Sequence, residues 1–153
     1  MQVSPDILRG ILSDVWGYDD FKPQQMDIIS MVTSGKDVVA LLPTGGGKSI
    51  CFQVPGLALG GLTVVISPLI SLIEDQVQQL KDRGISAHAF VGEMSASAFY
   101  QVLDMAQAGS IKFLYLSPER ATSKRFLERL PHLGVTLLAI DEAHCVSQWG
   151  HDF

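Results

Sequence analysis

A positive net charge, a signal peptide and a set of disulfide-forming cysteines are all lacking in this sequence of 153 residues. The two cysteines, Cys51 and Cys145, stand outside any C-x-x-C motif, and two thiols do not make a disulfide framework. With no signal peptide at Met1, we expect a reducing, cytosolic compartment. The net charge of −5 argues against a stand-alone basic nucleic-acid-binding module. Backbone amides, a few side chains or a partner domain would have to supply any contact with nucleic acid.

Charged side chains are also lacking throughout residues 49–73, a stretch long enough to cross a membrane. Pro55, Gly56 and Pro68 interrupt this stretch, and Gly60 and Gly61 add a turn. We therefore expect a helix, a turn, a strand and a second helix here, and no membrane span.

Short apolar runs alternate with helical patterns along the chain. Two helices are expected first, from Ser4-Pro5 to Gly17 and from Pro23 to Gly35. Five runs are then typical of strands buried on both faces, at 38–42, 63–66, 87–91, 112–116 and 136–140. Helical patterns separate them at 48–59, 69–80, 95–108 and 122–130. This alternation predicts an α/β fold with a doubly wound parallel sheet, whose ligands bind at the carboxyl ends of the strands.

A glycine-rich loop, 43–49, follows the first expected strand and precedes a helix. Three consecutive glycines let the backbone turn its N–H groups inward, and the helix adds its positive end. Lys48 would reach the β and γ phosphates of a nucleotide, and the Ser49 hydroxyl would bind Mg²⁺. The general P-loop pattern has glycine where this chain has Leu42, so a glycine turn that only caps a helix is the alternative interpretation.

Two carboxylates, Asp141 and Glu142, follow the last apolar run directly. In a doubly wound sheet this strand end lies beside the phosphate loop, so Asp141 can hold Mg²⁺ and Glu142 can orient or deprotonate an attacking water. An acidic turn after a core strand is the alternative. A zinc site at His144, Cys145 and His151 fits no strong ligand spacing.

Five sequence blocks, in order and covering nearly the whole chain, resemble the motifs of superfamily 2 helicases of the RecQ type, which carry a DEAH box. The blocks are 16–25, 42–49, 67–72, 117–120 and 141–153. The resemblance implies a P-loop NTPase (RecA-like) fold that is incomplete in this chain. It also implies N-terminal helices with an adenine-recognition segment over 1–35 and a first RecA-like motor domain over 36–153, ending before its last part.

Roles for individual residues follow from the same resemblance. The catalytic residues would be Lys48, Asp141, Glu142 and His144. Adenine would meet Tyr18, Lys22 and Gln25, and the phosphates would meet Thr44, Gly45, Gly46, Gly47, Lys48 and Ser49. Single-stranded DNA would meet Ser67, Pro68, Ser117, Arg120, Gln148, Trp149, His151 and Phe153. Purely structural interpretations remain as alternatives. Tyr18 and Phe21 could pack beneath the first helix, and Trp149 and Phe153 could belong to the core. The two Ser-Pro pairs could serve only as helix starts.

Departures from the family pattern stand in the adenine segment and at the end of the third run. Trp16 replaces phenylalanine, Lys22 replaces arginine, and Gln24 replaces glycine. Lysine lacks the planar fork that stacks on a base, so weaker adenine discrimination is expected. The sequence of segment 90–92 also departs from the family pattern, which leaves any DNA-binding role of this segment open.

The resemblance implies an ATP- and Mg²⁺-dependent 3′→5′ DNA helicase acting in recombination and repair, cytoplasmic and nucleoid-associated in a bacterium. Its partners would be single-stranded and partly duplex DNA and a second RecA-like domain beyond this chain, with no membrane and an undetermined oligomeric state. A further strand is expected between the strands ending at Pro43 and Asp141, so this chain alone should fold poorly and be inactive. Alternatives are a non-hydrolysing nucleotide-binding module or truncated competitor, and a superfamily 2 RNA motor.

Overall fold

The structure, a computed structural model, describes residues 3–43 and 47–142. The chain divides into two compact units, residues 1–60 and 61–153. This division differs from the functional boundary between residues 35 and 36 expected from the sequence, which stays a prediction.

Unit 1 is a small helical unit. It contains α1 (Pro5–Ile11), a π-helical turn η1 (Leu12–Trp16), α2 (Pro23–Thr33) and α3 (Ile50–Leu59). Ser4 caps α1 through its side chain, and Gly17 ends η1 in the left-handed conformation, as the sequence predicts. The core of the unit is built by buried apolar residues from all three helices and the segment before α2: Leu8, Leu12, Phe21, Ile29, Ile50 and Val54. This core fixes the amino ends of α2 and α3.

The apolar run at 38–42 does not form the predicted strand. Residues 36–43 have no regular secondary structure, and the side chains of Val39 and Leu41 are 90% and 91% exposed. The physical reason is that a strand is stabilised by hydrogen bonds to a neighbouring strand, and no strand of the described residues pairs with this run. The apolar pattern of residues 38–42 is typical of a strand, but the presence of a neighbouring strand to pair with cannot be predicted from this run alone.

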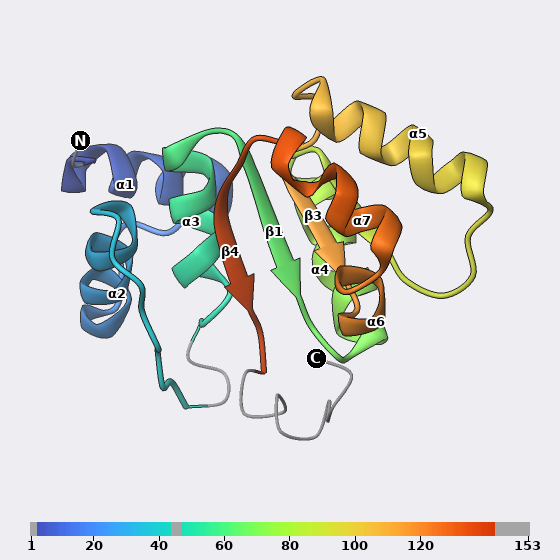
Figure 1. Ribbon diagram of the computed structural model, residues 1–153. Helices are drawn as coiled ribbons and strands as arrows, with labels where there is room; N and C mark the ends of the chain where they lie inside the picture. Colours follow the sequence, from blue (N-terminus) through green and yellow to red (C-terminus); the bar gives the residue numbers. More distant parts are fainter. Residues whose placement is uncertain (1–2, 44–46, 143–153) are drawn as a thin grey trace. The chain divides into compact units, whose positions relative to one another are not determined.

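Unit 2 is built on a four-stranded parallel sheet. Its strands are β1 (Leu62–Ile66), β2 (Ala87–Phe90), β3 (Phe113–Leu116) and β4 (Val135–Ile140), in the spatial order β2-β3-β1-β4. The helices that connect them are α4 (Ile70–Asp82), α5 (Ala96–Gln107), α6 (Pro118–Ala121) and α7 (Lys124–Arg129), followed by the short helix η2 (Leu130–His132) (Figure 1). Four of the five predicted strands are therefore confirmed, together with the RecA-like parallel architecture.

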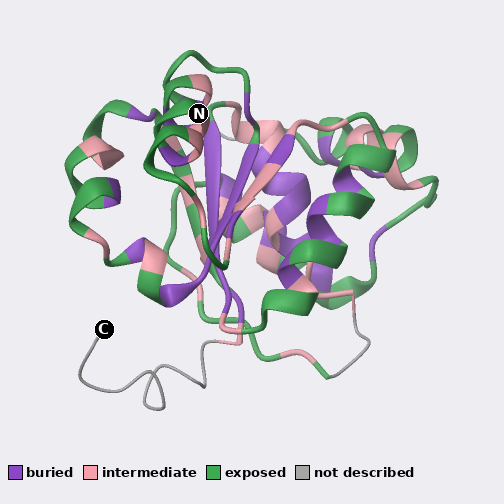
Figure 2. Ribbon diagram, turned by 90° about the vertical axis from the view of Figure 1, so that its right-hand side faces the viewer, coloured by how far each residue is buried: buried purple, intermediate pink, exposed green. Residues whose placement is uncertain are grey.

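The sheet separates two helical layers. On one face, alternate strand residues such as Val64, Leu114 and Leu116 pack with α5, α6 and α7 in the main core. On the other face, the hydroxyl of the buried Tyr115 donates to Oε1 of Gln76 in α4 at 2.8 Å. Tyr115 lies between Leu114 and Leu116, so it points to the opposite face. The strands β1 and β3 are buried over their whole length (Figure 2).

The strand β4 is different. Its residues alternate between half-buried and exposed, and Leu138 is 56% exposed. Among the described residues β4 pairs only with β1, so its other edge carries no strand.

The uncharged stretch 49–73 folds as expected into α3, β1 and the start of α4. In the part of the chain that the structure describes, no helix is both long and apolar enough to cross a membrane.

Candidate functional site

Gln25 connects the predicted adenine segment to the predicted phosphate loop within unit 1. Its Oε1 accepts a hydrogen bond from the backbone N–H of Lys22 at 2.9 Å, which closes the first turn of α2. Its Nε2 donates to the carbonyl oxygen of Gly47 at 3.0 Å. The side chain is only 5% exposed. Two residues predicted separately, 22 positions apart, are thus brought into direct contact.

Gly47 is held in a conformation that suits glycine alone. Its φ of 73° lies in the left-handed region. A Cβ at this position would lie 2.4 Å from Nε2 of Gln25. The backbone conformation therefore favours glycine, and a side chain here would also force the end of Gln25 to move away from its bond to Gly47.

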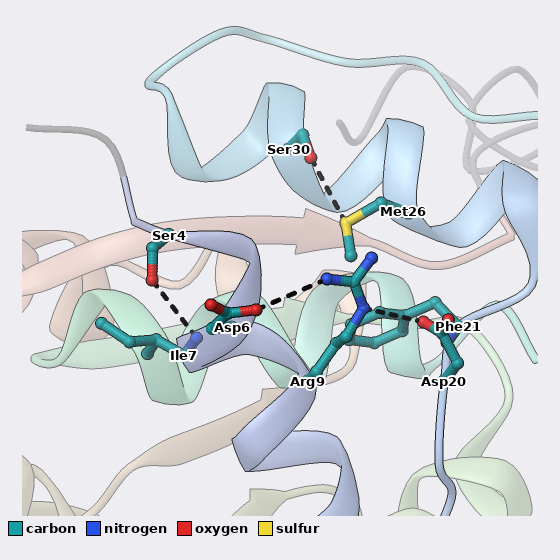
Figure 3. A network of polar contacts seen from close by, with 8 residues as sticks. All are labelled: Ser4, Asp6, Ile7, Arg9, Asp20, Phe21, Met26 and Ser30. Atoms are coloured by element: carbon teal, nitrogen blue, oxygen red, sulfur yellow. Dashed lines mark hydrogen bonds and ion pairs between the residues drawn. The ribbon is translucent and has the colours of Figure 1, made fainter.

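Arg9 and Asp20 tie the predicted adenine segment to α1, and the sequence analysis missed both (Figure 3). Nε of Arg9 donates to Oδ1 of Asp20 at 3.0 Å, and the same oxygen accepts from the backbone N–H of Phe21 at 2.8 Å. These two hydrogen bonds hold the pKa of Asp20 below its ordinary value, and the bond from Arg9 has the larger effect. Nothing in the sequence pattern marks this pair, because the two residues are 11 positions apart and belong to different elements.

The two aromatic residues of the adenine segment have different surroundings. Phe21 is buried in the core of unit 1, so the packing interpretation is correct for it. Tyr18 is 55% exposed, which leaves its ring accessible for stacking on a flat ligand. Lys22 is also exposed.

The start of α3 places Lys48 and Ser49 directly after the glycine loop. Ser49 is the N-cap residue, yet its hydroxyl makes no capping hydrogen bond, and the first turn of α3 holds no acidic side chain. The positive end of the helix is therefore not neutralised by a carboxylate of its own. Burial raises the pKa of the nearby Cys51 thiol to about 11, so this thiol is not a reactive one. Thr44, Gly45 and Gly46 lie outside the described residues.

In unit 2, three predicted site residues form a row along the carboxyl edge of the sheet. The backbone N–H of Asp141 donates to the carbonyl of Ile66 at 2.8 Å, and that of Ser67 donates to Leu116 at 3.1 Å. The N–H of Ser117 donates to Phe90 at 3.4 Å. Each residue that follows a strand thus bonds to the last residue of the neighbouring strand. Asp141, Ser67 and Ser117 consequently occupy successive positions across the sheet, about 5 Å apart from strand to strand.

Asp141 and Glu142 turn sharply after β4. Asp141 is 7% exposed, and its Oδ1 accepts from the backbone N–H of Glu142 at 3.0 Å. Glu142 has φ of 56°, the one positive φ of a non-glycine residue in the described part of the chain. Such a conformation costs about 1–3 kcal/mol and is concentrated at functional sites. His144 lies outside the described residues.

The hydroxyls of Ser67 and Ser117 are both engaged in the backbone that follows them. Oγ of Ser117 accepts from the N–H of Arg120 at 3.4 Å and caps α6, which confirms the helix-start interpretation. Oγ of Ser67 accepts from Leu69 at 3.4 Å, but α4 begins only at Ile70, so the expected helix start at Ser67-Pro68 is wrong by a few residues. The reason is that the backbone at Leu69 is extended.

The DNA contacts assigned to Ser67, Pro68, Ser117 and Arg120 stay predictions. The remaining predicted DNA-binding residues, Gln148, Trp149, His151 and Phe153, lie outside the described residues, and so does the zinc alternative at 144–151.

Comparison with known proteins identifies relatives of this chain. A model of the DEAD/DEAH box helicase family matches residues 22–153. A probable ATP-dependent DNA helicase RecS of Bacillus subtilis is 49% identical over 146 residues, which are 95% of this chain and 29% of that protein. The ATP-dependent helicase wrn-1 of Caenorhabditis elegans is 44% identical, over 100% of this chain and 14% of its own length. This chain therefore spans less than a third of these relatives.

Solved structures show the same fold. A crystal structure of the DUF1998 helicase MrfA bound to DNA and AMPPNP matches with a TM-score of 0.74 at 20% identity, over 91% of this chain and 21% of that one. A hypothetical ATP-dependent RNA helicase from Sulfolobus tokodaii matches with a TM-score of 0.71 at 20% identity, over 95% of this chain and 43% of that one. At this identity the likeness shows the fold alone.

Proposed function

Because this chain belongs to the DEAD/DEAH box helicase family, we propose that it is the ATP-binding part of an ATP-driven DNA helicase that moves 3′→5′. The row formed by Asp141, Ser67 and Ser117 is the observation that carries the proposal. It joins a carboxylate suited to Mg²⁺ to two serines of the predicted DNA-contact blocks through consecutive backbone hydrogen bonds. Because Ser67 and Ser117 are only 2% and 6% exposed, DNA in this proposal meets the serine end of the row at the segments that follow these residues, and its effect reaches the carboxylate along the edge of the sheet.

The residues of the nucleotide site fit ATP and Mg²⁺. The Ser49 hydroxyl is not used as a helix cap, so it suits a hard cation that prefers oxygen ligands. The amide of Gln25 is oriented by its bonds to Lys22 and Gly47, and in the proposal it joins the adenine contacts to the phosphate loop. The exposed ring of Tyr18 and the side chain of Lys22 complete the adenine contacts in the proposal.

Bound ATP with Mg²⁺ supplies a phosphoryl group whose transfer to water is strongly favourable. In the proposal, Lys48 would bind the β and γ phosphates, together with the backbone N–H groups of the glycine loop and the amino end of α3. Ser49 and Asp141 would provide oxygen ligands for Mg²⁺. Glu142 would hold the attacking water at its carboxylate and accept the proton. His144 belongs to the same proposed set.

The wider biological role is part of the proposal. The full-length protein would act on single-stranded and partly duplex DNA in recombination and repair, with a second RecA-like domain as its partner. A cytoplasmic location, on the nucleoid if the source is bacterial, is consistent with that role.

The decisive experiment is Glu142→Gln in the full-length protein, with ATP hydrolysis measured with and without single-stranded DNA. Loss of the general base should reduce kcat by roughly 10² to 10⁴, while ATP affinity stays within about twofold of wild type because the amide still fits. The matched control is Glu128→Gln, which changes an exposed glutamate of α7 and should leave both quantities unchanged.

Three other outcomes would contradict the proposal. Hydrolysis that survives Glu142→Gln removes the assigned base. A wild-type protein that binds ATP but never hydrolyses it is a nucleotide-binding module. Stimulation by RNA and not by DNA identifies an RNA motor.

A further inference from the structure

Arg120 of α6 is bound to a loop that the predicted DNA contacts do not include. One Nη2 N–H of Arg120 donates to the carbonyl oxygen of Gly92, in the segment between β2 and α5. The guanidinium also lies over the ring of Phe99, 5.9 Å from its centroid. Arg120 is half-buried, whereas Gly92 and its hydrogen bond to Arg120 are exposed.

Phe99 is anchored in the core. It is 3% exposed and stacks on Phe90, the last residue of β2, with ring centroids 4.5 Å apart and planes inclined by 25°. The carbonyl of Phe90 in turn accepts the backbone N–H of Ser117 at 3.4 Å. Arg120 therefore joins α6, α5 and the loop at 91–95 just where the row of site residues ends.

Carboxylates flank both partners of the Arg120 contact. Glu93 follows Gly92, Glu119 precedes Arg120, and both glutamates are exposed. These neighbouring negative charges make the surroundings of Arg120 less favourable to a phosphate. The planar fork of arginine, by contrast, suits a fixed hydrogen bond combined with stacking on a ring.

We propose that Arg120 is a positioning residue, which holds the loop 91–95 against α6 and so keeps the predicted DNA-contact block 117–120 in its place beside β2, without contacting phosphate itself. The inference rests on the proposed function. It gives the loop 91–95, which includes part of the segment 90–92 that departs from the family pattern, a place in the DNA-binding surface through its backbone.

The experiment compares Arg120→Gln and Arg120→Lys with wild type in the full-length protein. Affinity for single-stranded DNA is measured by fluorescence anisotropy over a series of salt concentrations, together with the DNA concentration that half-stimulates ATP hydrolysis. Both variants should bind DNA roughly tenfold more weakly, as expected for loss of a hydrogen bond from a charged donor. Lysine should not rescue, because it keeps the charge but not the fork.

The salt dependence separates positioning from phosphate contact. The slope of log K against log salt should be the same in all three proteins. Loss of a direct phosphate contact would reduce its magnitude by about 0.7 for single-stranded DNA, and lysine would largely restore binding. That pair of results overturns the inference, and so does unchanged DNA affinity in Arg120→Gln.

Three controls keep the test decisive. ATP affinity should stay at the wild-type value while the half-stimulating DNA concentration rises together with the dissociation constant for DNA. A merely structural role would lower the thermal midpoint and leave the half-stimulating DNA concentration unchanged. Arg125→Gln removes an exposed guanidinium that lies over Tyr100 at the same 5.9 Å, and should not weaken DNA binding; an equal loss there overturns the inference. If Arg120→Gln does not fold, the comparison of Arg120→Lys with wild type decides.

The two proposals fail differently. A wild-type protein without DNA binding or DNA-stimulated hydrolysis overturns the proposed function and this inference together. A wild type that binds DNA normally, with Arg120→Lys indistinguishable from it, overturns the inference alone.

Discussion

Gly47 is the position at which a single methyl group should be most damaging to unit 1. Gly47→Ala would place a Cβ 2.4 Å from Nε2 of Gln25 and force an L-residue to a φ of 73°. The conformational cost alone is about 1–2 kcal/mol, so we expect at least about tenfold weaker nucleotide binding, because the loop can no longer hold its conformation. Titration with a fluorescent ATP analogue measures this.

The matched control for Gly47→Ala is Gly10→Ala in α1. A Cβ there meets nothing within 4 Å, and alanine is the better helix former. This variant should raise the free energy of unfolding by roughly 0.5–1 kcal/mol and leave nucleotide affinity unchanged. Equal effects of the two alanines on nucleotide binding would show that Gly47 has no special role.

Asp20 links the stability of unit 1 to pH. Its pKa in the folded chain lies below the ordinary value of 3.8, so the unfolded state binds a proton first as the pH falls. The carboxylate therefore stabilises the folded state at pH values above 3.8, and this contribution is lost as the pH falls through the lower, folded value. Asp20→Asn should lower the urea midpoint at pH 7, and the difference from wild type should shrink below pH 3.8.

The neighbouring Asp19 provides the comparison for Asp20. It is exposed and stands one residue earlier in the same segment, so Asp19→Asn makes the same chemical change beside the network of Figure 3. The urea midpoint of this variant should follow wild type at every pH. A pH-independent deficit in Asp20→Asn would contradict an electrostatic origin.

At the scale of elements, the sequence predicts what is local and misses what is not. The helix that starts at Ser4 and the α5 cap at Ser95 were predictable because the capping serine lies three residues from the N–H it accepts. The prediction of a strand at 38–42 was wrong because strand pairing depends on a partner elsewhere in the chain. The contacts of Arg9 with Asp20 and of Arg120 with Gly92 left no signal, since they join positions 11 and 28 residues apart.

The outer edge of β4 should promote self-association. Leu138 is exposed on a strand whose second edge is unpaired among the described residues, and such apolar edges template pairing with other chains. Leu138→Thr should shift the chain toward monomer in sedimentation velocity. It should change the free energy of unfolding by no more than about 0.5 kcal/mol, as is usual for surface positions.

Leu114→Ala is the contrasting variant for Leu138→Thr. Leu114 is fully buried in β3, so its truncation should cost about 2–5 kcal/mol. If Leu138→Thr associates as strongly as wild type at equal concentration, β4 is not the edge through which the chains associate.

At the scale of the whole molecule, the acidic balance limits how DNA can be bound. The chain carries 11 Lys and Arg residues against 16 Asp and Glu residues. The proposed contacts in unit 2 are the two serine blocks, which release few counterions. The slope of log K against log salt for this chain with single-stranded DNA should therefore be shallower than about −2, whereas six Lys or Arg contacts would give about −4. A slope near −4 would indicate a basic interface that the proposal does not include.

In the row at the carboxyl edge of the sheet, the main chain of each residue fixes its position and the side chain supplies the chemistry. The geometry of Asp141, Ser67 and Ser117 depends on main-chain N–H groups, which every amino acid except proline supplies. Substitution of the side chains can therefore change the chemistry presented at this edge while the scaffold beneath it keeps its dimensions. A protein built in this way can acquire new ligand preferences in evolution one residue at a time without first redesigning its sheet.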